Sequence, residues 1–259
     1  MTVALAATEL GEGPAVAILH GLFGSGRNWT SIGRSLAARH RVLLFDLRNH
    51  GASPWADGMS YDEMAADVHA ALALRGLARA ALLGHSLGGK VAMALAMAEP
   101  EAVARLLVVD IAPVPYPPTL LGHARAMQTL DLTQIRRRSE ADRLLAAAIP
   151  DPAERAFLLQ NLILTEEGAR WRLNLAAIAE GMPLISGFPS FPPSRVYGGP
   201  TLFVAGGRSP YLRAEHEPLI KGLFPAARVV RIAQAGHWVH AEAPAGFLAL
   251  AAPFLAGGN

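Results

Sequence analysis

The chain has 259 residues, of which 52% are hydrophobic, and this composition is sufficient for one large buried core. Its lack of cysteine excludes disulfides, thiolate catalysis and sulfur-ligated metals. The formal net charge is only +2, and the basic cluster Arg136–Arg138 is followed closely by acidic residues, so we expect no binding to nucleic acid.

The hydropathy along the chain also bears on location. No apolar stretch reaches the roughly 18 uninterrupted residues that a membrane-spanning helix needs. The first ten residues lack a basic segment ahead of their short apolar run, so they do not have the composition of a secretory signal. We therefore expect a cytoplasmic protein without a membrane span.

Short apolar runs alternate along the chain with segments of helical periodicity, which is typical of βαβ units in a mostly parallel sheet. These runs, together with an edge strand at Thr2–Leu5, predict strands at Ala15–His20, Arg41–Leu47, Arg79–Gly84, Arg105–Ile111, Thr201–Gly206 and Ala227–Ile232. The predicted helices are Trp29–Arg39, Ser60–Arg75, Leu87–Ala98, Arg213–Leu223 and Pro244–Phe254. Ser60 and Glu63 have the spacing of a capping box, which marks one helix start. The pattern predicts an α/β fold with a mostly parallel sheet flanked by helices.

A long segment between Ile111 and Thr201 interrupts this alternation, because it contains no clear strand pattern. Prolines cluster at both of its ends, and its helix-like stretches are Leu120–Leu130, Glu140–Ala148, Ala153–Leu164 and Trp171–Ala179. This organisation predicts a helical cap, residues 113–195, inserted into a core domain made of residues 1–112 and 196–259.

The motif Gly-His-Ser-Leu-Gly at residues 84–88 matches the Gly-x-Ser-x-Gly pattern of a nucleophile elbow. A predicted strand ends at Gly84 and a predicted helix begins at Leu87, so Ser86 lies in a tight turn between them. Only small residues at both ends of such a turn avoid a clash with the neighbouring chain. The helix N-terminus favours developing negative charge. We therefore predict that Ser86 is a nucleophile.

A serine hydroxyl needs an adjacent base to react at neutral pH. Among nine histidines, His237 follows the last predicted strand in a Gly-His-Trp loop and comes last in the chain, as the order serine, acid, histidine requires. His69 lies within a predicted helix, and His240 is expected to pack or to pair with Glu242. We predict that His237 is the general base.

The His-Gly loop at residues 20–24 follows the first inner strand and can turn a backbone N–H toward the serine. We assign the oxyanion hole to the N–H groups of Leu22 and Leu87, with Phe23 as the alternative to Leu22. The residues expected to contact substrate adjoin these positions and are His20, Phe23, His85 and Trp238. No cluster of His, Asp and Glu has metal-ligand spacing in the sequence, so we expect neither a metal nor a cofactor.

Four motifs in order resemble those of one protein family. They are Leu-His-Gly-Leu-Phe-Gly-Ser at 19–25, Phe-Asp-Leu-Arg-Asn-His-Gly at 45–51, the elbow at 84–88 and Val-Asp-Ile-Ala-Pro at 109–113. The chain resembles the α/β-hydrolase superfamily over essentially its whole length, and within it the YbfF-type bacterial esterases and related mitochondrial abhydrolases. The resemblance implies the α/β-hydrolase fold with an inserted helical cap.

Most superfamily members place the catalytic acid after the strand that follows the cap, where this chain has Ser209. A hydroxyl cannot replace the anion that stabilises an imidazolium. Asp110 ends the strand before the cap, and the YbfF-like resemblance implies that it is the acid; the alternative is an aspartate that only caps a turn. Asp46, at another strand end, is expected to form a structural network with Arg48 or with neighbouring backbone.

These residues lead to hydrolysis of a small carboxylic ester or thioester through an acyl-Ser86 intermediate, in a monomer or homodimer. Lactonases, acyltransferases, carbon–carbon bond hydrolases and cofactor-free haloperoxidases use the same residues and stay open as alternatives. A ligand-binding, receptor-like α/β-hydrolase without activity is the alternative from a different class. The charges of the predicted cap nearly cancel, and its apolar residues predict an acyl pocket.

Overall fold

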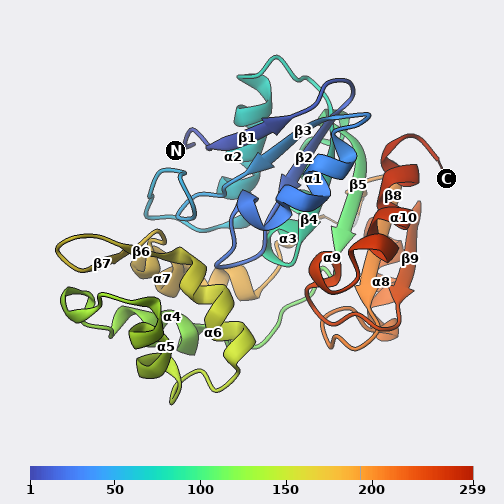
Figure 1. Cartoon of the computed structure of the whole chain (residues 1–259). Coiled ribbons are helices and arrows are strands. Elements are labelled where there is room, and N and C mark those ends of the chain that lie inside the picture. The colour runs from blue at the N-terminus through green and yellow to red at the C-terminus, as the bar shows by residue number, and fades with distance from the viewer. Residues whose placement is uncertain (193, 259) are drawn as a thin grey trace.

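A seven-stranded sheet forms the centre of the protein, and the computed structural model describes residues 1–192 and 194–258 (Figure 1). The strand order is β1-β3-β2-β4-β5-β8-β9, and every neighbouring pair is parallel except β1 with β3. The strands are β1 Ala7–Leu10, β2 Ala15–Leu19, β3 Arg41–Phe45, β4 Ala80–His85, β5 Val103–Val109, β8 Thr201–Gly206 and β9 Ala227–Ile232. The predicted mostly parallel sheet is confirmed.

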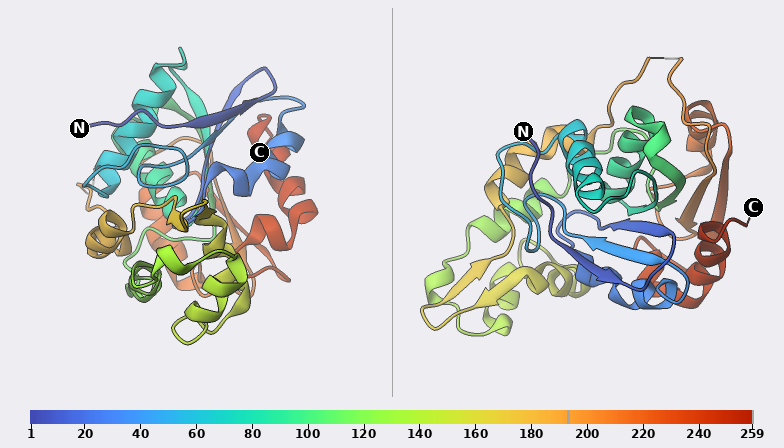
Figure 2. Two further views of the ribbon diagram at one scale, coloured as in Figure 1. Left: turned by 60° about the vertical axis from the view of Figure 1, so that its left-hand side comes forward. Right: turned by 90° about the horizontal axis from the view of Figure 1, so that it is seen from above.

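Helices cover both faces of this sheet (Figure 2). In β2, Ala17 and Leu19 belong to the same buried cluster as residues of α2, α3 and α8, whereas Val16 and Ile18 belong to the cluster that contains residues of α1, α9 and α10. The inner strands are continuously apolar because both of their faces are buried. The helices of the two layers are α1 Thr30–Leu36, α2 Tyr61–Ala73, α3 Leu87–Ala98, α8 Glu217–Leu223, α9 Val239–Glu242 and α10 Pro244–Leu255, with short 3-10 turns η1 Gly26–Trp29, η2 Pro100–Ala102 and η5 Ala214–His216.

Two local predictions near the N-terminus have different outcomes. The capping box is present: the Ser60 side chain accepts from the Glu63 N–H, and the Glu63 carboxylate accepts from the Ser60 N–H. The predicted edge strand at Thr2–Leu5 is wrong, because the edge strand is β1 at Ala7–Leu10. An edge strand with one open side tolerates polar residues, so its sequence carries no continuous apolar run.

The segment between β5 and β8 lies to one side of the sheet, at the lower left of Figure 1. Its elements are α4 Leu121–Gln128, η3 Leu132–Gln134, α5 Arg138–Leu145, α6 Pro152–Leu158, η4 Leu159–Asn161, β6 Leu162–Leu164, β7 Ala169–Trp171 and α7 Leu175–Ser186. The expectation that it holds no strand is wrong, since β6 and β7 form a short antiparallel hairpin. Its division from the core at residues 113–195 stays a prediction.

The last helix of this segment begins later than the predicted helix at Trp171–Ala179. The side chain of Asn174 accepts from the Ala177 N–H and caps the start of α7. The helix then continues through Gly181 and Pro183 to Ser186. Glycine and proline are helix-breaking signals in a sequence, and here the packing of the buried face outweighs them.

A buried lysine connects α3 to both ends of the inserted segment. Lys90 lies one turn after Ser86, and its Nζ donates to the carbonyl oxygens of Val114 at 2.8 Å, Ser186 at 3.3 Å and Gly187 at 2.5 Å. Burial lowers the pKa of Lys90 to about 7, whereas the three carbonyls favour its charged form. The three protons of one ammonium therefore join two backbone segments, at Val114 and at Ser186–Gly187, that are far apart in the chain.

Candidate active site

Ser86 occupies a strained turn between β4 and α3. Its φ of 51° and ψ of −118° lie outside the regions that non-glycine residues favour. A Cβ at Gly84 would lie 2.2 Å from the carbonyl oxygen of Gly88, and a Cβ at Gly88 would lie 2.4 Å from that of Leu19. The turn therefore requires both glycines of the motif, and it lifts Ser86 above the end of the sheet.

The carboxylate of Asp110 is fully buried at the end of β5 and accepts three hydrogen bonds. The donors are the Gly206 N–H at 2.9 Å, the Ser209 hydroxyl, and Nδ1–H of His237 at 2.7 Å. His237 lies in the loop between β9 and α9, so groups that follow the neighbouring strands β8 and β9 both bond the carboxylate that follows β5. Ser209, at the position where most superfamily members have an acid, donates to the acid of the neighbouring strand.

Ser86 and His237 border the same cavity, which has a volume of about 210 Å³. The predicted site residues His20, Leu22, Phe23, His85 and Trp238 also line this cavity. The structure therefore brings together most of the predicted site at the carboxyl ends of the parallel strands, where ligands bind in open α/β sheets. Leu87 borders a second, smaller cavity that also reaches Ser86.

The backbone donors beside Ser86 differ in their partners. The Phe23 N–H donates to Nε2 of His50 at 3.2 Å. The N–H groups of Leu22 and Leu87 have no acceptor among the residues that the structure describes, and Leu87 is the first residue of α3, where no intrahelical acceptor exists. This geometry favours Leu22 over Phe23 as a donor to a substrate oxygen.

Two buried histidines hold the loop that carries Leu22. His20 donates through Nδ1 to the Gly21 carbonyl at 2.8 Å and accepts at Nε2 from the Leu47 N–H at 2.9 Å. His50 donates through Nδ1 to the Arg48 carbonyl at 2.8 Å. Burial lowers the pKa of His20 to about 4 and that of His50 to about 3, so both rings are neutral. His20 therefore offers a substrate only the face of its ring.

His85 holds the backbone of His237. Its Nε2 donates to the carbonyl oxygen of His237 at 2.9 Å, and burial lowers its pKa well below the usual value. The side chain of Glu242 accepts from the N–H groups of Gly236 at 2.7 Å and Trp238 at 3.2 Å. The loop around His237 is therefore fixed from both sides.

Sequence reasoning missed Tyr211, which stacks on the His237 ring with centroids 4.2 Å apart and borders both cavities. The hydroxyl of Tyr116 donates to the Tyr211 carbonyl at 2.5 Å and so positions the backbone. The sequence offered one signal for Tyr211: it lies two residues after Ser209, in the loop where most superfamily members place the catalytic acid. The hydrogen bond between Nε2 of His123 and the Glu154 carboxylate, 3.1 Å long at the larger cavity, was also missed.

Asp46 was predicted to form a structural network with Arg48 or with neighbouring backbone, and the second alternative is confirmed. Its carboxylate accepts from the N–H groups of Gly26 and Ala52, each at 2.7 Å. Arg48 is not its partner and instead forms a buried ion pair with Asp67 at 2.6 Å.

His240 was predicted either to pack or to pair with Glu242, and it packs. Its ring stacks on Trp29 with centroids 3.8 Å apart, and Glu242 bonds backbone N–H groups instead of pairing with it. Within residues 1–192 and 194–258 no three His, Asp or Glu side chains gather in a way that could hold a metal ion. The same residues include no helix with both the length and the apolar character that crossing a membrane requires.

Comparison with known proteins agrees with this geometry. Residues 14–244 match the family described as alpha/beta hydrolase fold, and the chain belongs to this family. The "sn-1-specific diacylglycerol lipase ABHD11" of Mus musculus is 40% identical over 94% of this chain and 81% of its own length. "Esterase YbfF" of Escherichia coli is 34% identical over 88% of each chain. A solved structure titled "Marine microorganism esterase" is 37% identical, has a TM-score of 0.94, and matches over 98% of this chain and 100% of that one. The expected resemblance and the serine hydrolase class with the α/β-hydrolase fold are confirmed.

Proposed function

We propose that the protein is a carboxylesterase that hydrolyses small esters with Ser86 as nucleophile, His237 as general base and Asp110 as the acid. One observation carries this proposal: His237 shares a cavity with Ser86 while its Nδ1–H donates to the buried Asp110 carboxylate at 2.7 Å. That hydrogen bond keeps the proton on Nδ1 and leaves Nε2 as the base.

The reaction follows from the positions of these groups. Nε2 of His237 takes the Ser86 proton as Oγ attacks the ester carbonyl, and the imidazolium is stabilised by Asp110. The N–H groups of Leu22 and Leu87 stabilise the negative charge on the carbonyl oxygen. The C–O bond to the alcohol then breaks, and His237 returns the proton to the departing oxygen. In the second half, His237 takes a proton from water as the water attacks the acyl-Ser86 carbonyl; the C–Oγ bond then breaks, His237 returns the proton to Oγ of Ser86, and the acid is released.

The names of the relatives support an ester as the substrate class, since they include an esterase and a lipase. Acyl transfer, with an alcohol in place of water, would use the same acyl-enzyme and is the second candidate. Thioester cleavage, a cytoplasmic location and a monomeric or homodimeric state stay predictions from the sequence. So do the limits of the cap, residues 113–195, which we propose sets substrate choice.

The proposal is tested with Ser86→Ala. This variant should lose at least ~10³-fold in kcat/KM on p-nitrophenyl butyrate, because no other hydroxyl occupies the elbow. It should also lose labelling by a fluorophosphonate probe, which reacts only with an activated serine. The matched control is Ser35→Ala, whose exposed hydroxyl bonds only its own helix. Retained labelling or turnover in Ser86→Ala would exclude Ser86 as the nucleophile.

A further inference from the structure

Two cavities border Ser86, and they differ in volume and in which of the proposed reacting residues line them. The larger has a volume of about 210 Å³ and the smaller about 60 Å³. His237 lines the larger cavity, whereas Leu87 and Lys90 line the smaller. An ester held at Ser86 has two arms, an acyl group and an alcohol, and each arm needs its own space.

The position of the base decides which arm lies where. His237 must deliver its proton to the oxygen of the departing alcohol, so that oxygen lies within hydrogen-bond reach of its ring. His237 belongs to the wall of the larger cavity, and the alcohol therefore extends into that cavity. The acyl group, on the other side of the reacting carbon, is left with the smaller cavity.

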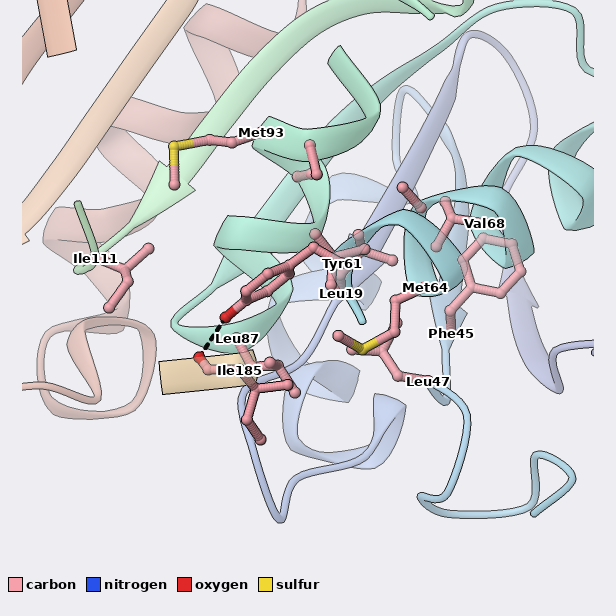
Figure 3. Close-up of a cluster of buried hydrophobic side chains, with 14 of the residues drawn as sticks. Leu19, Phe45, Leu47, Tyr61, Met64, Val68, Leu87, Met93, Ile111 and Ile185 are labelled. Atoms are coloured by element: carbon pink, nitrogen blue, oxygen red, sulfur yellow. Dashed lines mark hydrogen bonds between the residues drawn. The ribbon is translucent and has the colours of Figure 1, made fainter. Parts of the chain in front are cut away.

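The smaller cavity is lined mainly by apolar side chains, and two of its polar groups, the Tyr61 hydroxyl and the Lys90 ammonium, are already bonded to the protein. The hydroxyl of Tyr61 donates to the Ile185 carbonyl at 2.6 Å (Figure 3), and the Lys90 ammonium donates to three carbonyls. The apolar part of the wall includes Leu87, Ile111, Met182 and Ile185, and hydroxyl groups enter it from Thr119 and Tyr211. Lys90, the cation of the described wall, is bonded to three carbonyls and so is not free for a carboxylate on the acyl group.

The size of this cavity limits the length of the acyl chain. A water-sized group needs roughly 10–15 Å³ on this measure, so 60 Å³ holds about four to six such groups. The space fits an acyl chain of about four carbons.

The larger cavity offers both apolar and polar partners to an alcohol. Phe157 and Trp238 contribute aromatic rings with centroids 5.6 Å apart. The hydrogen-bonded pair of His123 and Glu154 lies in the same wall, with Glu242 also present. These groups can hydrogen-bond a hydroxyl, and the described wall holds two carboxylates without Arg or Lys to bind an anion.

We propose that the smaller cavity is the acyl site and the larger cavity is the alcohol site. The preferred substrates are then esters of short, uncharged acyl groups with larger, non-anionic alcohols. This assignment rests on the proposed esterase function. It goes further by stating which cavity selects the acyl group and which selects the alcohol.

The test separates the two halves by enlarging one cavity at a time. Met182→Ala and, as an independent second variant, Ile185→Ala should raise the ratio of kcat/KM for p-nitrophenyl hexanoate over butyrate by about 10-fold, a typical effect of added apolar space. Phe157→Ala is the matched control in the other wall. It should leave this ratio within about 2-fold and instead change the preference between phenethyl acetate and ethyl acetate by about 10-fold.

Each result has a defined meaning. An acyl-chain preference that moves with Phe157→Ala, and not with either variant of the smaller cavity, overturns the assignment. A wild-type enzyme that prefers octanoate to butyrate overturns the short-chain limit. Absence of all ester turnover in the wild-type protein, together with absence of fluorophosphonate labelling, contradicts the proposed function itself and is distinguishable from both.

Discussion

At the residue scale, the unusual feature is the Asp110 carboxylate. It follows β5, but two of its hydrogen-bond donors come from the end of β8 and the loop after it. Asp110 has a positive φ of 51°, which turns its side chain toward the backbone after β8. Ser209 stands in the position of the common acid and donates to Asp110. The three donors replace the water contacts that this carboxylate loses on burial.

We expect Asp110→Asn to reduce kcat/KM on p-nitrophenyl butyrate by about 10³–10⁴-fold, since an amide no longer stabilises the imidazolium or fixes its tautomer. Ser209→Ala should cost only about 10-fold, because it removes one of three donors. Steady-state kinetics of both variants, with circular dichroism to check folding, make the comparison. A larger loss in Ser209→Ala than in Asp110→Asn would mean that the acid is assigned wrongly.

The sequence allowed the prediction of Ser86 and His237, because a nucleophile elbow and a terminal Gly-His-Trp loop are local patterns. Tyr211 could not be predicted, since its contact with His237 depends on how two loops meet at the sheet edge. The partner of Arg48 was missed for the same reason: Asp67 lies on the buried side of α2, and nothing in the sequence distinguishes it from a solvated acid.

At the element scale, α3 joins the nucleophile to the inserted segment through Lys90. The three carbonyl acceptors come from Val114 near the start of that segment and from Ser186 and Gly187 at the end of α7. A change in the position of either end therefore acts on the first turns of the helix that carries Ser86.

Lys90→Met keeps the approximate length of the side chain but leaves three half-buried carbonyls without their donor. We expect the free energy of unfolding to fall by about 2–4 kcal/mol and amide hydrogen exchange to increase at both ends of the segment. Lys221→Met is the matched control at the other lysine, which is exposed, and should cost less than about 1 kcal/mol. Equal losses in the two variants, measured by urea unfolding, would contradict the role of Lys90.

The inserted segment is also where element prediction failed. The hairpin β6–β7 has strands of three residues each, too short to show an alternating pattern. The helix α7 contains a glycine and a proline, and its extent is set by burial of Ile178, Met182 and Ile185. The core strands were predictable because burial on both faces leaves a continuous apolar run for each.

At the scale of the whole molecule, four buried neutral histidines link stability to pH. Burial lowers the pKa of His20 to about 4, of His50 and His240 to about 3, and of His85 well below its usual value. Below pH ~6.5 the unfolded chain binds protons at these positions while the native protein does not. Their contribution is fully present above that pH and is lost as the pH falls toward the native values.

The free energy of unfolding should therefore decrease by about 1.4 kcal/mol per buried histidine for each pH unit below ~6.5. Urea unfolding at pH 7.5, 6.0 and 5.0 measures this slope. His50→Gln should reduce the number of protons taken up on unfolding by about one, and the slope by the corresponding ~1.4 kcal/mol per pH unit. His69→Gln, at a half-buried position on α2, is the control. A free energy that stays constant from pH 7.5 to 5.0 would contradict the linkage.

The contact between Asp110 and His237 spans 127 residues and has a consequence for biosynthesis. A growing chain first completes the proposed nucleophile, oxyanion donors and acid, all within residues 1–112, and acquires the proposed base only after β9 has been made. A nascent chain therefore lacks the proposed triad until His237 has been made. For the same reason, activity recovered after refolding would require the C-terminal quarter of the chain to dock.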